Sequence, residues 1–267
     1  TVLLATLLIT VRDLTSTTIT AFSGMFIRDL ASDILKITVY VVTAFSFIYA
    51  KPYLIERGLY KSEYYVLCLF AVLGMMLMIS AGNLTVLYLG LELVALSSYG
   101  LVGLDRDNPI ASEAAMKYFV LGAIASGLLL YGMSMMYGAT GSLQLDTIYL
   151  AAAQTTSPFM FKLGVVFILA GIAFKFGAAP FHMWLPDVYQ GAPTAVTAFI
   201  SSAPKLAAFA MAYRLLESAA GVAASDWVPM LAGIAALSLI LGNLMALVQS
   251  NFKRLLAYST ISHVGFL

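Results

Sequence analysis

The sequence predicts an all-α membrane protein: a polytopic transmembrane helical bundle with a broken helix. The 267 residues are 61% hydrophobic and 10% charged, with a mean hydropathy of +0.94, whereas soluble domains carry about 25% charged residues. Apolar runs of about 20 residues, the length that one bilayer crossing needs, recur along the chain. Between two of these runs, a stretch rich in proline and charge interrupts the pattern.

The elements are predicted in order from these runs. Residues 1–11 are expected to be the end of a helix, and the polar segment Arg12–Asp29 to be a loop or a short surface segment. Full spans are then predicted at 30–50, 64–82, 84–104, 112–138, 159–179, 194–216 and 227–249, with another starting near Phe252. Gly82-Asn83 predicts a tight turn, and residues 139–158 form the longest connection between spans.

We expect residues 1–267 to be a single transmembrane domain, with about seven full spans and partial helices at both ends, because no linker divides the chain. It starts without methionine and stops inside an apolar run, so we expect a fragment of a longer polytopic protein. The single cysteine, Cys68, excludes a disulfide framework. The nearly neutral charge leaves no basic face for nucleic acid.

The broken helix is predicted within residues 174–205. Pro180, Pro186, Pro193 and Pro204 each remove a backbone donor and resist a continuous helix. Backbone that is broken at membrane depth must be buried in protein or line a wet cavity, because lipid offers no hydrogen-bond partners. We therefore expect this stretch to lie at a functional site.

Three charged residues are the candidates for chemistry because they are the deepest charges in the predicted spans. Glu92 is near the middle of the third span, Lys175 precedes the break, and Lys205 directly follows a proline. Charged residues within the membrane usually mark ion or substrate paths. The alternative for Glu92 is a neutral, hydrogen-bonded carboxyl with a structural role. The alternative for the two lysines is snorkelling, in which the long side chain carries the ammonium group to the membrane surface.

Other polar residues allow two interpretations. Glu113 and Lys117 are four apart on one helix face, which favours an ion pair over a proton path. His263 lies inside the last predicted helix, where an imidazole could relay protons or be structural.

Three residues near the break have more ordinary interpretations. We expect His182 and Trp184 to anchor the chain at the membrane interface. Asp187 is expected to cap a short helix or to bind backbone amides.

The sequence has no metal-ligand spacing, phosphate-binding glycine loop, haem motif or nucleophile elbow. We therefore expect no cofactor-binding and no metal-binding residues in this chain. What it holds is a sparse row of ionisable groups inside a membrane bundle. Two unit charges about 10 Å apart, at an effective dielectric constant near 20, interact by roughly 1.7 kcal/mol. A moving partner can therefore make such a group hold or release its proton.

Several motifs resemble one protein family, the antiporter-like membrane subunits of respiratory NADH:quinone oxidoreductase (complex I). They are FKFGAAPFHMWLPDVYQGAPT, SSAPKLAAFAMAYRLL, GNLMALVQSNFKRLLAYSTISHVGFL, LGLELVALSSYGLVG and SEAAMKYFVLGAIASG. The likeness runs from about residue 62 to 267. The form PDVYQGAPT resembles the subunit N branch more than subunits L and M or the multisubunit cation/proton antiporters.

The resemblance implies a fourteen-helix fold with two inverted five-helix repeats, of which this chain would hold the first and part of the second. By motif match, proton transfer is assigned to Glu92, Lys175 and Lys205. Lys117 and His263 fall on family positions associated with the same hydrophilic axis and are possible relays.

The resemblance also implies partners, cofactors and location. The partners would be the other membrane-arm subunits of complex I and the lipid bilayer. NADH, FMN, iron–sulfur clusters and quinone would be bound by other subunits. The chain would move protons across a bacterial cell inner membrane, coupled to electron transfer from NADH to quinone. A subunit of a cation/proton antiporter and a scaffold that does not pump remain alternatives.

Overall fold

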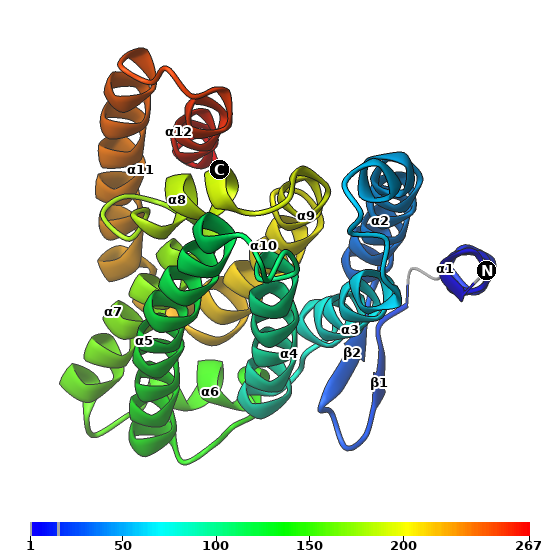
Figure 1. Cartoon of the computed structure of the whole chain (residues 1–267). Helices are drawn as coiled ribbons and strands as arrows, with labels where there is room; N and C mark the ends of the chain where they lie inside the picture. The colour runs from blue at the N-terminus through cyan, green and yellow to red at the C-terminus, as the bar shows by residue number, and fades with distance from the viewer. Residues whose placement is uncertain (1, 15–16) are drawn as a thin grey trace.

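The chain forms a bundle of roughly parallel helices in a computed structural model that describes residues 2–14 and 17–267 (Figure 1). Seven helical segments in these residues are long and apolar enough to cross a membrane. They span Leu30–Glu56, Ser62–Ile79, Leu84–Val102, Pro109–Thr140, Pro158–Phe176, Thr194–Ala219 and Gly221–Leu247. Each lies within six residues of its predicted bounds, so the predicted helical membrane fold is confirmed. Residues 1, 15 and 16 of the first two predicted segments lie outside the described residues.

The individual elements are more numerous than the spans, because the sixth span is divided and short helices lie outside the spans. The helices are α1 (Val2–Arg12), α2 (Leu30–Glu56), α3 (Ser62–Ile79), α4 (Leu84–Val102), α5 (Pro109–Thr140), α6 (Leu145–Ala152), α7 (Pro158–Phe176), α8 (Trp184–Gly191), α9 (Thr194–Ile200), α10 (Ala203–Tyr213), α11 (Ala224–Leu247) and α12 (Phe252–Val264). A π-helix, η1 (Arg214–Ala219), continues α10, and a 3-10 turn, η2 (Gly221–Ala223), precedes α11.

Local sequence signals set the helix ends. The predicted tight turn at Gly82-Asn83 is confirmed, because α4 starts directly after it and the Asn83 side chain accepts a hydrogen bond from the amide of Thr85 at 2.7 Å. Helix α5 starts with Pro109, whose missing amide donor costs nothing in a first turn. It ends at Gly141, which has the left-handed φ of 72° that glycine adopts without strain.

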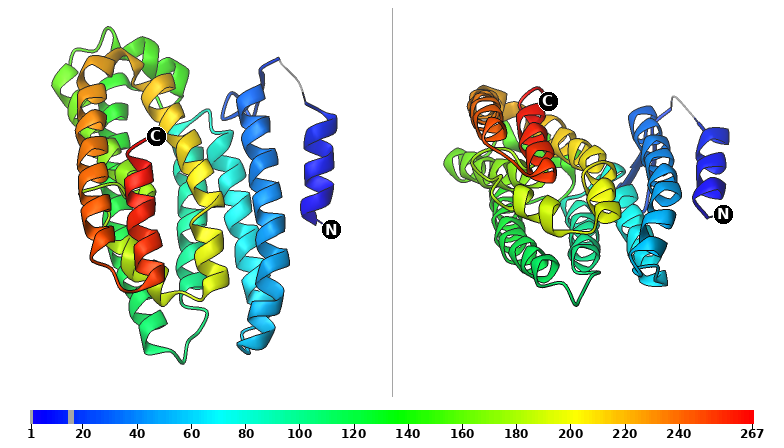
Figure 2. Two further views of the ribbon diagram at one scale, coloured as in Figure 1. Left: turned by 90° about the horizontal axis from the view of Figure 1, so that it is seen from above. Right: turned by 45° about the horizontal axis from the view of Figure 1, so that its top comes forward.

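The helices pack through small residues. Helices α3 and α4 lie side by side, and so do α5 and α7 (Figure 2). A Cβ atom on Gly74 would lie 2.7 Å from the carbonyl oxygen of Gly90, and one on Gly132 would lie 2.6 Å from that of Gly164. Close backbone contact through small residues is typical of helices in lipid. Helix α1 lies at one edge of the bundle, and its described residues are not buried (Figure 2).

The segment Arg12–Asp29, predicted to be a loop or a short surface segment, contains a β-hairpin. Strands β1 (Ile19–Ala21) and β2 (Phe26–Arg28) pair antiparallel, with Ile19 opposite Arg28. The hairpin is held on the turn between α3 and α4, where the carbonyl of Ser80 accepts a hydrogen bond from the amide of Ile27 at 2.7 Å. Its strands are too short to show an alternating pattern, so this contact, and not local propensity, stabilises them.

The predicted connection at 139–158 contains the short helix α6. It buries Leu145, Ile148 and Ala152 against the bundle. Eight residues are too few for a helical period to be recognised against the surrounding punctuation.

The predicted break is confirmed, and it lies between α7 and α10. Helix α7 ends at Phe176, and Gly177 follows with a left-handed φ of 75°. Pro193 and Pro204 mark the starts of α9 and α10. Pro186 is different, because it lies in the first turn of α8, where a helix tolerates proline. The break places the ends of three short helices inside the bundle.

Candidate functional site

Two side chains donate hydrogen bonds to carbonyl groups in the last turn of α7. An α-helix leaves its last four carbonyls without partners in the helix. The indole of Trp184 donates to the Phe174 carbonyl at 3.0 Å, and the ammonium of Lys205 donates to the Phe176 carbonyl at 2.7 Å. A positive charge is also favourable at this negative end of the helix dipole. Lys205 is therefore attached to the broken helix.

Helix α11 satisfies a backbone donor of the break. The amide of Ala179 donates to the hydroxyl of Ser238 at 2.9 Å, and Ser238 is fully buried. Irregular backbone inside a bundle needs such partners, because lipid supplies none. The backbone at the break is thus stabilised by a contact with α11.

Lys175 and Lys205 line one small cavity, together with Tyr118 and Trp184. Its volume is about 30 Å³. A buried water needs roughly 10–15 Å³, so the cavity has room for a water molecule. Both lysines are partly buried, and they approach the cavity from α7 and α10. The break therefore brings the two lysine side chains to one small, mostly apolar cavity.

Glu92 is the carboxyl group that interacts electrostatically with Lys175. It lies in the middle of α4, which also contributes Leu91 and Ala95 to the cavity wall. Its Oε1 atom is buried and has no hydrogen-bond partner among the described residues. Most buried polar atoms have a hydrogen-bond partner, so this oxygen is an exception. The three predicted proton-transfer residues are thus brought to one region.

Lys117 lies in a separate ion cluster. Its ammonium is 2.9 Å from Glu113, which confirms the predicted pair, and 2.7 Å from Asp187 on α8. The other oxygen of Asp187 pairs with Arg254 of α12 at 2.6 Å. These residues line a cavity of about 230 Å³. We call Glu113, Lys117, Asp187 and Arg254 the Asp187 cluster.

Two expectations for the break are wrong. Asp187 does not cap a helix: α8 begins after Met183 without a side-chain cap, and the carboxylate pairs with two cations instead. Trp184 is not an interfacial anchor, because only 4% of it is exposed and its ring stacks on Tyr118 at 4.6 Å. Of His182, the Nδ1 atom is buried and unpartnered among the described residues.

His263 is the predicted relay that the fold keeps apart from the cavity. It is exposed on α12, and its ring centroid lies 6.2 Å from that of Phe266. Its role remains a prediction.

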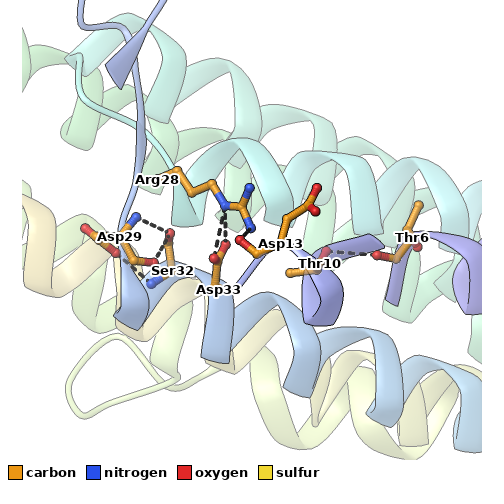
Figure 3. Close-up of polar contacts among 7 residues, drawn as sticks. All are labelled: Thr6, Thr10, Asp13, Arg28, Asp29, Ser32 and Asp33. Carbon is orange, nitrogen blue, oxygen red and sulfur yellow. Dashed lines mark hydrogen bonds and ion pairs between the residues drawn. The ribbon is translucent and has the colours of Figure 1, made fainter. Parts of the chain in front are cut away.

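A second group of charges, not predicted from the sequence, lies at the start of α2. Both oxygens of Asp33 lie 3.0 Å from Nε of Arg28 (Figure 3). Asp29 caps α2 and pairs with Arg214 at 2.9 Å, while Lys36 is only 7% exposed. The signal that could have revealed this group was a lysine and an aspartate inside a predicted apolar span.

Within residues 2–14 and 17–267, no group of three or more His, Cys, Asp or Glu side chains is arranged around a position for a metal ion. Cys68 is a buried free thiol.

Residues 81–267 match the protein family described as NADH:quinone oxidoreductase/Mrp antiporter, TM. The chain belongs to this family. The match includes all five predicted site residues: Glu92, Lys117, Lys175, Lys205 and His263.

Relatives of this antiporter family are similar over most of the chain. NADH-quinone oxidoreductase subunit N of Xanthomonas euvesicatoria pv. vesicatoria is 57% identical over 92% of this chain and 50% of its own length. The subunit N of Thiobacillus denitrificans is 55% identical over 97% of this chain and 54% of its own length. The chain therefore spans about half the length of these curated relatives.

A solved structure agrees with the fold. A chain of respiratory complex I from Thermus thermophilus with bound aureothin superposes with a TM-score of 0.81 at 36% identity, covering 99% of this chain and 55% of that chain. The antiporter-family fold therefore extends over nearly the whole chain.

Proposed function

We propose that this chain moves protons across a bacterial cell inner membrane as part of subunit N of NADH:quinone oxidoreductase, coupled to electron transfer from NADH to quinone. The observation that carries the proposal is the shared cavity of Lys175 and Lys205 at the broken helix, with Glu92 as the charged neighbour of Lys175. The coupling to NADH and quinone is proposed because these relatives are named NADH-quinone oxidoreductase subunit N.

The proposed transfer uses side chains of this chain and water. A protonated Lys175 gives a proton to a water in the cavity, and the water passes a proton to the neutral amine of Lys205. Glu92 favours the charged form of Lys175 while its carboxylate is near. Two charges about 10 Å apart interact by roughly 1.7 kcal/mol at an effective dielectric constant of about 20. Movement of the Glu92 carboxylate away from Lys175 would therefore release the proton of Lys175 more readily.

Lys117 and His263 are proposed as relays further along the path. Lys117 already pairs with Asp187 beside the 230 Å³ cavity. We propose that NADH, FMN, iron–sulfur clusters and quinone bind to other subunits, and that the other membrane-arm subunits are the partners of this chain. The fourteen-helix repeat belongs to the same proposal.

The test uses the complete complex in closed membrane vesicles. Glu92→Gln, Lys175→Met and Lys205→Met are each made in the full-length subunit, and proton uptake is measured per NADH oxidised. We expect each variant to lower uptake. Lys162→Gln is the control, because Lys162 is exposed and pairs with Asp226 at 2.9 Å, away from the cavity of the two lysines.

Two results would overturn the proposal. Unchanged uptake in all three variants would remove these residues from any proton path. A defect that only follows a loss of assembled complex would indicate a scaffold that does not pump.

A second candidate is a cation/proton antiporter subunit, because the family description covers both kinds of protein. Proton movement that continues after NADH and quinone are removed would favour it. Proton movement that stops would favour the respiratory role.

A further inference from the structure

Helix α10 and the residue directly after it carry two cationic side chains, each bonded to the last carbonyl of a different helix. Lys205, in its first turn, donates to Phe176, the last residue of α7, at 2.7 Å. Arg214, directly after its last residue, donates through Nε to Ile79, the last residue of α3, at 2.9 Å. Both contacts place a positive charge at the negative end of a helix dipole.

Arg214 has a second partner that is itself fixed. Its terminal nitrogen pairs with the Oδ2 atom of Asp29 at 2.9 Å, and Arg214 is only 8% exposed. Asp29 is held by two hydrogen bonds with Ser32 (Figure 3). The Ser32 amide donates to the Asp29 carboxylate at 2.7 Å, and the Asp29 amide donates to the Ser32 hydroxyl at 3.0 Å. Charge-assisted hydrogen bonds of this kind are about twice as strong as neutral ones. Arg214 thus joins α10 to both α2 and α3.

The two cations hold α10 from opposite sides. Nine residues separate Lys205 from Arg214. That is about 13.5 Å along an α-helix and about two and a half turns, so the side chains leave on opposite faces. Helix α10 indeed contacts α7 as well as α2 and α3. At Arg214 the α-helix also gives way to the π-helix η1, a local change often found at functional sites.

We propose that Arg214 is a positioning residue for Lys205. It fixes the height and rotation of α10 against α2 and α3, and this places the Lys205 ammonium on the end of α7 and in the cavity shared with Lys175. The inference rests on the proposed proton-transfer role of Lys205. A merely structural role for Arg214 would stabilise the bundle without affecting how Lys205 exchanges its proton.

The experiment compares three variants in the full-length subunit within the complex. Arg214→Met removes both contacts. Arg214→Lys can reach the carbonyl or the carboxylate but lacks the planar fork that bonds both. Asp29→Asn keeps the size and the capping ability of the side chain but loses its charge. Proton uptake per NADH oxidised is measured in vesicles over a range of pH, together with the amount of assembled complex.

We expect Arg214→Met to lower uptake about tenfold, since small misplacements of a reacting group cost up to about a hundredfold. The pH of half-maximal uptake should shift, Asp29→Asn should show a smaller shift in the same direction, and Arg214→Lys should restore part of the loss. The control Lys162→Gln should match the unaltered protein.

The results that overturn the inference differ from those that overturn the proposed function. Unaltered uptake and pH profile in Arg214→Met and Asp29→Asn overturn it, as does a loss that only follows the amount of assembled complex. If the complex with Arg214→Met does not assemble, Asp29→Asn tests the inference instead, and an unshifted pH of half-maximal uptake in that variant overturns it. Full uptake in Lys205→Met would instead contradict the proton-transfer role of Lys205 under the proposed function, so the two failures are distinguishable.

Discussion

Lys205 combines two properties that different substitutions can separate. Its ammonium satisfies the Phe176 carbonyl at the break, and the same group can give up a proton in the cavity. Arginine can keep the first property but not the second, because its guanidinium does not deprotonate in proteins. Methionine keeps neither.

Lys205→Arg is therefore expected to keep the thermal stability of the complex while proton uptake is lost. Lys205→Met should lose uptake and also about 1–3 kcal/mol of stability, since it leaves a buried carbonyl without its partner. Thermal unfolding and proton uptake of both variants check this pair of outcomes. Uptake by the Arg variant at the level of the unaltered protein would contradict a proton-carrying role.

Asp29 gives a pH dependence whose sign follows from its contacts. Burial would raise the pKa of its carboxyl, but the hydrogen bond from Ser32 and the charge of Arg214 outweigh burial and hold the pKa below its usual 3.8. A carboxyl with a lowered folded-state pKa stabilises the fold above the unfolded pKa and loses this contribution as pH falls through the folded one.

Asp29→Asn is accordingly expected to be less stable than the unaltered protein at pH 7, with the difference shrinking below about pH 4. Thermal unfolding of the purified protein in detergent between about pH 3 and pH 7 measures this. A difference that stays constant over the whole range would show that the ion pair with Arg214 contributes nothing.

At the scale of helices, backbone contact makes glycine necessary at some positions only. A Cβ atom on Gly132 would lie 2.6 Å from the Gly164 carbonyl oxygen, whereas one on Gly127, in the same helix, would meet no described atom within 4 Å. Alanine is the better helix former by about 1 kcal/mol. The two positions should therefore respond in opposite directions.

Gly132→Ala is expected to destabilise the protein by about 1–3 kcal/mol, because α5 and α7 must move apart. Gly127→Ala should be neutral or stabilise by up to about 1 kcal/mol. Unfolding temperatures of the two variants in the same detergent provide the comparison. Equal effects would contradict the close contact between α5 and α7.

The elements that could be predicted from the sequence are those whose signal lies within one segment. Apolar length located the spans, and the prolines of residues 174–205 located the break. The β-hairpin and α6 escaped because their stability comes from contacts with distant residues, as between Ile27 and Ser80. Trp184 was misplaced for a similar reason: its partners Tyr118 and Phe174 lie on α5 and α7.

At the scale of the whole molecule, charge pairs join helices that are distant in sequence. Asp187 on α8 binds Lys117 of α5 and Arg254 of α12, and Asp29 at the start of α2 binds Arg214. Glu92, Lys175 and Lys205 could be picked from sequence because each is conspicuous in an apolar span. Asp187 could not, since its partners are 70 and 67 residues away.

The Asp187 cluster should make the stability of the bundle sensitive to salt. Asp187→Asn removes the charge that joins α5, α8 and α12, and the groups are partly exposed, with side-chain exposures of 43%, 31% and 28% for Lys117, Asp187 and Arg254. Exposed pairs contribute up to about 1 kcal/mol, more when several charges form a network. We therefore expect a loss of about 1 kcal/mol at low ionic strength.

The loss caused by Asp187→Asn should shrink at about 1 M salt, where the screening length falls to about 3 Å. Glu113→Gln is the matched control, because Glu113 is 65% exposed and pairs with Lys117 within one helix. Such a pair contributes only about 0.3–0.5 kcal/mol. Thermal unfolding at low and high salt measures both variants. An equal loss at both salt concentrations would mean that Asp187 acts through shape and hydrogen bonding, and that charge does not hold the three helices together.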